Sequence, residues 1–121
     1  MRYAAAPVGN LRWQPPRAPA LQPNAPVTSA TALGPACPQA FPSVPGLPHI
    51  PGNEDCLFLN VYAPAHAANL PVLVWIHGGG YGFGEANNDM ASIIKANNDG
   101  IVVVAINYRV CPSAGRLCFS V

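Results

Sequence analysis

Proline distribution is the feature that most restricts what this sequence can fold into. Twelve of its fifteen prolines lie within the first 51 residues. Each proline fixes φ and removes a backbone hydrogen-bond donor, so this part of the chain cannot form regular helix or a central strand. Its large apolar side chains favour an ordered coat packed on a surface over a free linker; they are Trp13, Phe41, Leu47 and Ile50.

Three apolar runs follow the proline-rich segment: "CLFLNVYAP" at 56–64, "PVLVWIHG" at 71–78 and "GIVVVAINYR" at 100–109. We predict a strand in each run. The second and third runs are apolar on both faces, which indicates strands buried in a mostly parallel sheet. We expect helices to cover that sheet, and one candidate is present: "NNDMASIIKANNDG" at 87–100. It has Asn or Asp as its N-cap and a stop at Asn98 to Gly100. Its expected apolar stripe is Met90, Ala91, Ile93 and Ile94.

Composition excludes several classes of function. The 121 residues leave room for one small domain or a piece of a larger one, and only 9% of them are charged, with a net charge of +1. Such a low and nearly balanced charge does not predict a basic surface that would bind nucleic acid or an anionic membrane. The longest apolar runs fall well short of the roughly 20 residues that cross a bilayer. The first residues lack the apolar core of a secretion signal.

Four cysteines stand at positions 37, 56, 111 and 118. They include no C-x-x-C pair, and no histidine lies at zinc-ligand spacing, so we expect neither a metal site nor another cofactor. Three disulfide connectivities are possible, and whether any forms depends on the compartment.

The segment "WIHGGGYGFG", residues 75–84, holds five of the eleven glycines directly behind the second apolar run. A phosphate-binding loop is excluded, because neither G-x-G-x-x-G nor G-K-S/T spacing occurs there. Two interpretations remain: glycines that serve only a positive-φ loop, or an oxyanion hole whose backbone N–H groups bind developing negative charge. An HGGG element of this kind is typical of lipases and esterases. The element here is His77, Gly78, Gly79 and Gly80.

Four segments together resemble the type-B carboxylesterases, the family of cholinesterases and fungal lipases. In chain order they are "RYAAAPVGNLRWQPP", "EDCLFLNVYAP", "PVLVWIHGGGYGFG" and "IVVVAINYRV". The resemblance implies a partial α/β-hydrolase fold: the first part of the central, mostly parallel sheet with an irregular proline-rich N-terminal coat. Residues 1–110 would be the N-terminal part of a carboxylesterase domain, and residues 111–121 a divergent tail.

The resemblance also assigns roles within the glycine loop. Gly79 and Gly80 match the glycines whose N–H groups bind the oxyanion. Gly78 matches a position that lets the chain turn out of the strand, and His77 one that is structural rather than the catalytic base. The substrate implied is a small-molecule carboxylic ester.

Outside the loop, the resemblance implies a disulfide between Cys37 and Cys56. It also implies an ion pair between Arg12 and Glu54. Members of the family typically belong to the secretory pathway. His49 and His66 match no family role, and we expect both at the surface.

The family's nucleophile is a serine in a G-E-S-A-G-like elbow, and no G-x-S-x-G occurs in this sequence. "CPSAG" at 111–115 is a near match, but Cys111 replaces the first glycine and Pro112 restricts the turn, so we reject Ser113 as a nucleophile. We interpret the sequence as an N-terminal fragment of a carboxylic-ester hydrolase that lacks the triad and is inactive alone. The alternatives are a non-catalytic binding or adhesion module on the same scaffold, and an unrelated small secreted protein held by disulfides. The sequence makes no prediction of oligomeric state.

Overall fold

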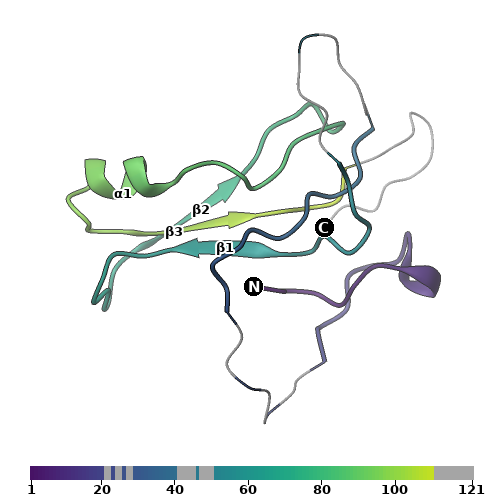
Figure 1. Cartoon of the computed structure of the whole chain (residues 1–121), viewed down its shortest axis with the longest axis horizontal. Coiled ribbons are helices and arrows are strands. Elements are labelled where there is room, and N and C mark those ends of the chain that lie inside the picture. Colours follow the sequence, from purple (N-terminus) through teal and green to yellow (C-terminus); the bar gives the residue numbers. More distant parts are fainter. Residues whose placement is uncertain (21–22, 24–25, 27–28, 41–45, 47–50, 111–121) are drawn as a thin grey trace.

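The computed structural model describes residues 1–20, 23, 26, 29–40, 46 and 51–110. A 3-10 helix, η1, lies in the proline-rich coat. The three strands and the α-helix all follow that coat (Figure 1). Their bounds are η1 Gly9–Leu11, β1 Leu59–Tyr62, β2 Val72–Ile76, α1 Ala91–Ala96 and β3 Val102–Ile106.

The sheet is mixed and has the order β1-β3-β2. β2 and β3 are parallel, with Val74 opposite Val104. β1 and β3 are antiparallel, with Val61 opposite that same Val104. A parallel pair requires a crossover connection, which the glycine loop and α1 provide here. The expected mostly parallel sheet is therefore correct for β2 and β3, while β1 is antiparallel.

Helix α1 forms where the 3.6-residue pattern predicted it. The Asp89 carboxylate accepts a hydrogen bond from Ala91 N at 2.9 Å and satisfies one of the free N–H groups of the first turn. The helix ends before Asn98 and Asp99, whose φ angles of 52° and 56° cannot continue it. The helix therefore begins and ends close to the predicted signals.

One face of the sheet packs on α1. Met90 and Ile94 are buried against Val103 and Ala105, both of which have no exposed surface. Of the predicted stripe, Ile93 packs at the edge of this cluster, whereas Ala91 is exposed. This small cluster fixes the sheet relative to the helix through apolar burial.

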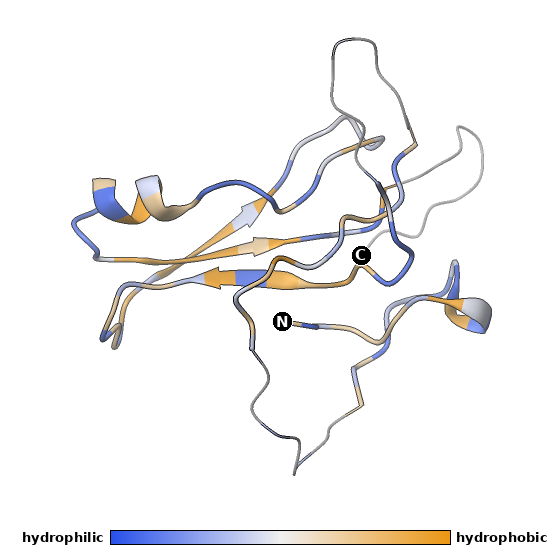
Figure 2. Cartoon of the chain, in the orientation of Figure 1, coloured by the Kyte–Doolittle hydropathy of each residue, from blue (hydrophilic) through white to orange (hydrophobic). Residues whose placement is uncertain are grey.

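The other face of the sheet is exposed, and this corrects one expectation. The strand register places the side chains of Val61, Val72, Val74 and Ile76 on this face, and they are 49%, 59%, 55% and 63% exposed. Figure 2 shows most of β1 in the orange of hydrophobic residues, with one blue band, and a paler arrowhead on β2. β2 was predicted to be buried on both faces, but it is an edge strand whose residues are all exposed. Its apolar sequence gives the strand a suitable surface for burial, yet no described residue provides the cover.

The first residues of the coat lie along β1 on the side away from β3. Met1 and Leu59 exchange backbone hydrogen bonds, and an isolated bridge joins Arg2 to Phe58. A second buried cluster holds the coat in place, formed by Ala4, Cys37, Cys56 and Leu57. Among the described residues, no helix is both long and apolar enough to cross a membrane.

Candidate functional site

The glycine loop begins directly after β2, at the carboxyl end of that strand. Gly79 O accepts hydrogen bonds from Gly82 N at 3.0 Å and from Phe83 N at 3.1 Å, which closes a tight turn. At the tip, Tyr81 has a φ of 63° and a side chain that is 91% exposed. The carboxyl end of a strand is where α/β folds usually carry ligand chemistry.

Glycine is sterically required at Gly79. Its φ is 138°, and a Cβ built there would lie 1.6 Å from Phe83 O. Gly80 also has a positive φ, of 56°, but a Cβ there would meet nothing within 4 Å. Gly79 is half-buried and Gly80 exposed, and the N–H of neither donates to an acceptor in the described part of the chain. Two backbone donors are therefore available at the end of β2.

Gly78 differs from its two neighbours. Its φ lies outside the left-handed region, and a Cβ there would meet nothing within 4 Å. The positive-φ residues of the loop begin at Gly79, and the turning role that the resemblance implied for Gly78 stays a prediction.

His77 is buried beneath the loop, with only 6% of its surface exposed. Its ring stacks on Tyr108 at 4.1 Å between centroids and 13° between planes. The Tyr108 hydroxyl donates a hydrogen bond to His77 O, and His77 Nδ1 lies 2.9 Å from Gly78 O. The structure thus places His77 as a packed residue at the base of the loop.

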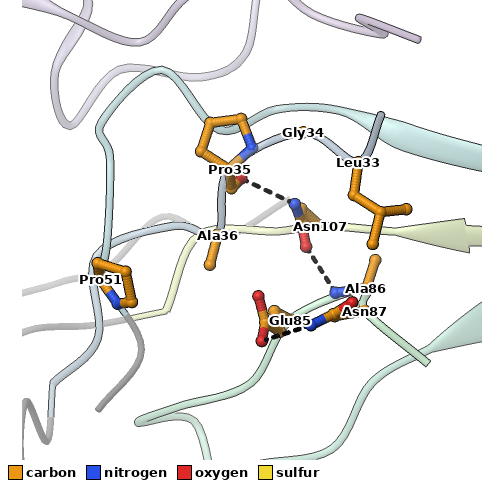
Figure 3. A pocket seen from close by; sticks show the side chains of 9 residues that line it. All are labelled: Leu33, Gly34, Pro35, Ala36, Pro51, Glu85, Ala86, Asn87 and Asn107. Atoms are coloured by element: carbon orange, nitrogen blue, oxygen red, sulfur yellow. Dashed lines mark hydrogen bonds between the residues drawn. The ribbon is translucent and has the colours of Figure 1, made fainter. Parts of the chain in front are cut away.

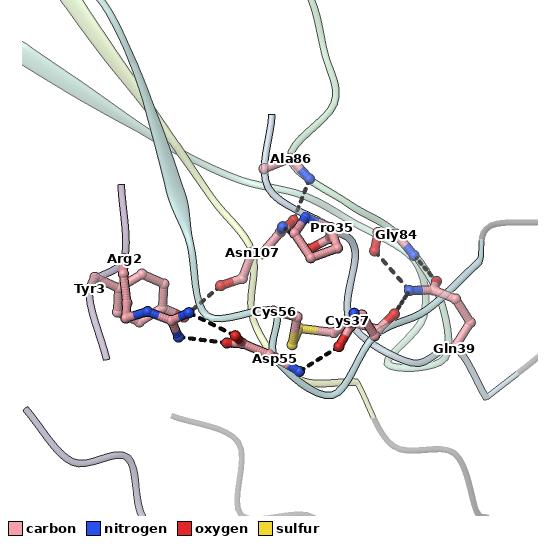
Figure 4. Close-up of a disulfide and its surroundings, with 11 residues drawn as sticks. Arg2, Tyr3, Pro35, Cys37, Gln39, Asp55, Cys56, Gly84, Ala86 and Asn107 are labelled. Atoms are coloured by element: carbon pink, nitrogen blue, oxygen red, sulfur yellow. Dashed lines mark hydrogen bonds and ion pairs between the residues drawn. A yellow bond between two sulfur atoms is a disulfide. The ribbon is translucent and has the colours of Figure 1, made fainter. Parts of the chain in front are cut away.

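The part of the coat that carries Cys37 supports the glycine loop. Cys37 and Cys56 form a disulfide, as the resemblance implied. Close to it, the Gln39 side chain hydrogen-bonds both the N–H and the carbonyl of Gly84 (Figure 4). Ala40 N donates to Gly82 O at 2.7 Å. Gln39 and Ala40, which follow Cys37 in the coat, therefore contact the glycine loop directly.

Asn107 connects the coat to the segment after the loop. Its Nδ2 donates to Pro35 O at 3.0 Å, and its Oδ1 accepts from Ala86 N at 2.7 Å. Its backbone carbonyl accepts from the Tyr3 hydroxyl at 2.5 Å. Burial raises the pKa of Tyr3, against an opposing effect from Arg109. Sequence reasoning did not identify Gln39 or Asn107; Asn107 begins the "NYR" that closes the third apolar run.

Two ion pairs hold the coat to the segment before β1. Arg12 Nε lies 2.6 Å from Glu54 Oε1, with both side chains more than 40% exposed. Arg2 makes two hydrogen bonds to Asp55, at 2.5 and 2.7 Å. The hydrogen bonds from Arg2 lower the pKa of Asp55, while partial desolvation opposes the shift.

The remaining predicted residues lie away from the loop or outside the described part. His66 is exposed. The described ranges exclude His49, Cys111, Ser113 and Cys118. Within those ranges, no three His, Cys, Asp or Glu side chains come close enough together to hold a metal ion.

A pocket of about 300 Å³ lies between the coat and the segment after the loop (Figure 3). Its polar lining groups are already engaged with one another or with the backbone: Asn107 bonds Pro35 and Ala86, and Asn87 lies 3.3 Å from the Glu85 carboxylate. No residue of 77–80 lines it. We therefore assign the candidate chemistry to the glycine loop and not to this pocket.

The sheet, the crossover helix and the loop at the end of β2 define part of an α/β-hydrolase fold. A profile of the carboxylesterase family matches residues 1–114. The chain belongs to the carboxylesterase family.

Two curated relatives illustrate this membership. The acylcarnitine hydrolase of Mus musculus is 44% identical over 119 residues, covering 88% of this chain and 21% of that protein. The para-nitrobenzyl esterase of Bacillus subtilis (strain 168) is 40% identical over 116 residues, covering 91% of this chain and 23% of that protein. The chain thus spans less than a quarter of these relatives. Both are named as ester-cleaving enzymes or hydrolases, so they do not favour a binding or adhesion module.

Solved structures agree with the sequence comparison. Aspergillus niger EstA superposes with a TM-score of 0.75 at 40% identity, covering 91% of this chain and 21% of that one. A thermophilic PNB esterase gives a TM-score of 0.75 at 38% identity, covering 93% and 24%. The sheet and coat described above therefore occur in esterases of known structure.

Proposed function

We propose that this chain forms the oxyanion-binding part of a serine-type carboxylic-ester hydrolase. The N–H groups of Gly79 and Gly80 would bind the oxygen that becomes negative when an ester carbonyl is attacked. The observation that carries this proposal is that both amides lack an acceptor in the described chain while the loop around them is held by hydrogen bonds. Donors fixed before the reaction need no reorganisation as charge develops.

The contribution of such donors to the rate of turnover is expected to be large. Removing a single oxyanion-hole donor typically lowers turnover about 10² to 10³-fold. Backbone N–H groups suit this role, because glycine leaves the approach of the substrate free of Cβ atoms. The loop's position at the end of β2 supports the assignment.

The nucleophile and its partners lie outside these residues in our proposal. No G-x-S-x-G occurs in the 121 residues, and losing a triad serine or histidine typically costs about 10⁶ in turnover. We expect the purified chain to show no hydrolysis of p-nitrophenyl acetate above buffer. Activity that disappears in the Ser113→Ala variant would contradict both this proposal and the rejection of Ser113.

A chimera tests the oxyanion role directly. It joins residues 1–110 of this chain to the remaining part of the Bacillus subtilis para-nitrobenzyl esterase. In it, Gly80→Ala should lower kcat at least about 10-fold, because the new Cβ disturbs the donor that stabilises the transition state.

Gly9→Ala is the matched control for that variant. Gly9 has a φ of 55°, close to the 56° of Gly80, and a Cβ at either position meets nothing within 4 Å. Both changes therefore carry the same backbone strain, but Gly9 lies in the coat. Equal kcat values for the two variants would remove Gly80 from the oxyanion site.

A further inference from the structure

His77 is a buried residue at the base of the loop whose chemistry the proposed function leaves unused. Its Nδ1 lies 2.9 Å from Gly78 O, which is a carbonyl and can only accept a hydrogen bond. Nδ1 must therefore carry the proton. The opposite tautomer would set two lone pairs against each other and leave an N–H unpaired at Nε2, the single buried side-chain polar atom without a partner among the described residues.

The acceptor of this bond belongs to the same peptide unit as a proposed oxyanion donor. Gly78 C=O and Gly79 N–H lie in one planar group, and no described peptide bond is cis. In a trans peptide the C=O and N–H point in opposite directions. A side chain that holds Gly78 O therefore also sets the direction of Gly79 N–H.

The surroundings of His77 keep the ring in place for this bond. Tyr108 stacks on the ring and its hydroxyl holds the backbone carbonyl of His77. On the loop side, a Cβ at Gly84 would lie 2.3 Å from His77 Nδ1 and 2.4 Å from Gly78 O. Glycine at position 84 therefore leaves the space that the hydrogen bond occupies.

We infer that His77 is a positioning residue that aims Gly79 N–H through a hydrogen bond from its protonated Nδ1 to Gly78 O. The catalytic part of this inference rests on the proposed oxyanion role. The same bond polarises the peptide, because hydrogen bonds in a chain strengthen one another, and this makes Gly79 N–H a better donor. His77 itself touches neither substrate nor nucleophile in this role.

Two substitutions separate hydrogen bonding from packing. His77→Asn places an amide N–H near the position of Nδ1 and removes the ring, whereas His77→Phe keeps a ring against Tyr108 and removes the donor. If the hydrogen bond positions the loop, the Phe variant is the more damaging. If packing alone matters, the Asn variant is.

The first measurement uses the full 121-residue chain labelled with ¹⁵N. We expect the imidazole ¹⁵N spectrum to show that His77 carries a proton on Nδ1. The amide signal of Gly79 should shift in His77→Phe and return toward its original position in His77→Asn. An Nδ1 without a proton, or a Gly79 signal that moves only in His77→Asn, would overturn the inference.

The second measurement determines kcat and KM in the chimera. It remains informative if the His77→Phe variant of the 121-residue chain does not fold. There, His77→Phe should lower kcat about 10-fold with little change in KM, and His77→Asn should recover most of that loss. Gly84→Ala should reproduce the loss, because its Cβ displaces the same hydrogen bond. A Gly79 signal that responds as expected without any change in kcat would sink the oxyanion role while leaving the loop assignment intact. Equal kcat values for His77→Phe and His77→Asn would sink the positioning role.

Discussion

Gln39 binds both backbone groups of Gly84. Its Oε1 accepts from Gly84 N at 2.6 Å, and its Nε2 donates to Gly84 O at 3.2 Å and to Cys37 O at 2.6 Å. One side-chain amide thus connects the return of the glycine loop to the disulfide segment of the coat. The proline-rich coat therefore takes part in shaping the candidate site.

Gln39→Leu should loosen the loop. The substitution leaves the part-buried N–H and carbonyl of Gly84 without their side-chain partner, at a cost of about 1–3 kcal/mol in the free energy of unfolding. Denaturant titration gives that free energy, and hydrogen exchange should show faster exchange at the Gly84 amide. Gln14→Leu is the matched control on the exposed surface of the coat. An equal loss in both variants would contradict the role assigned to Gln39.

The disulfide should stabilise the chain by about 3 kcal/mol. Cys37 and Cys56 are 19 positions apart, and closing a loop of that size removes entropy from the unfolded chain. We expect the double variant Cys37→Ala/Cys56→Ala to unfold at lower denaturant concentration. Adding a reductant should then shift the original chain more than the double variant. A midpoint that does not move on reduction would contradict this prediction.

The sequence was sufficient to predict the strands, helix α1 and the parallel pair, because hydrophobic period and capping residues are local signals. Asp89, Asn98 and Gly100 lie within a few positions of the helix ends that they mark. Burial of β2 could not be predicted in the same way. An apolar strand indicates that its burial would be favourable, but whether other residues bury it depends on other parts of the fold.

The candidate site was predictable in part for the same reason. The run of glycines after β2 is a local signal, and the resemblance to the esterases then assigned the oxyanion role to Gly79 and Gly80, which stays a prediction. The groups that support the loop are not local: Gln39 bonds a residue 45 positions away, and Tyr108 bonds one 31 positions away. Only the folded chain brings such pairs together, so single-residue patterns do not reveal them.

Acid should weaken the attachment of the coat through Asp55. The pKa of Asp55 is lowered from its ordinary 3.8, chiefly by hydrogen bonds from Arg2, so the folded state favours the carboxylate. The resulting stability is present above the unfolded pKa and is lost as pH falls through the lower folded value. Because about a third of each side chain is exposed, we expect at most about 1 kcal/mol.

Comparison with the Asp55→Asn variant measures the contribution of the Asp55 carboxylate to the free energy of unfolding. The difference in unfolding free energy between the original chain and this variant should be largest at neutral pH and should shrink below about pH 4. Asp99→Asn removes an exposed carboxylate from the turn after α1 and serves as the control. A difference that stays constant across this pH range would show that the Asp55 charge contributes nothing.

Self-association through the exposed sheet should respond to one charge on β2. Val74 is 55% exposed in the middle of an edge strand that has no charged residue, and unprotected apolar edges pair readily with other chains. Val74→Lys should lower the apparent mass in concentration-dependent light scattering, because pairing or stacking of this strand would bury the new ammonium group. Val8→Lys makes the same substitution at a coat residue that is 43% exposed, and it should change the association little. If both variants reduce association equally, net charge and not the β2 surface governs it.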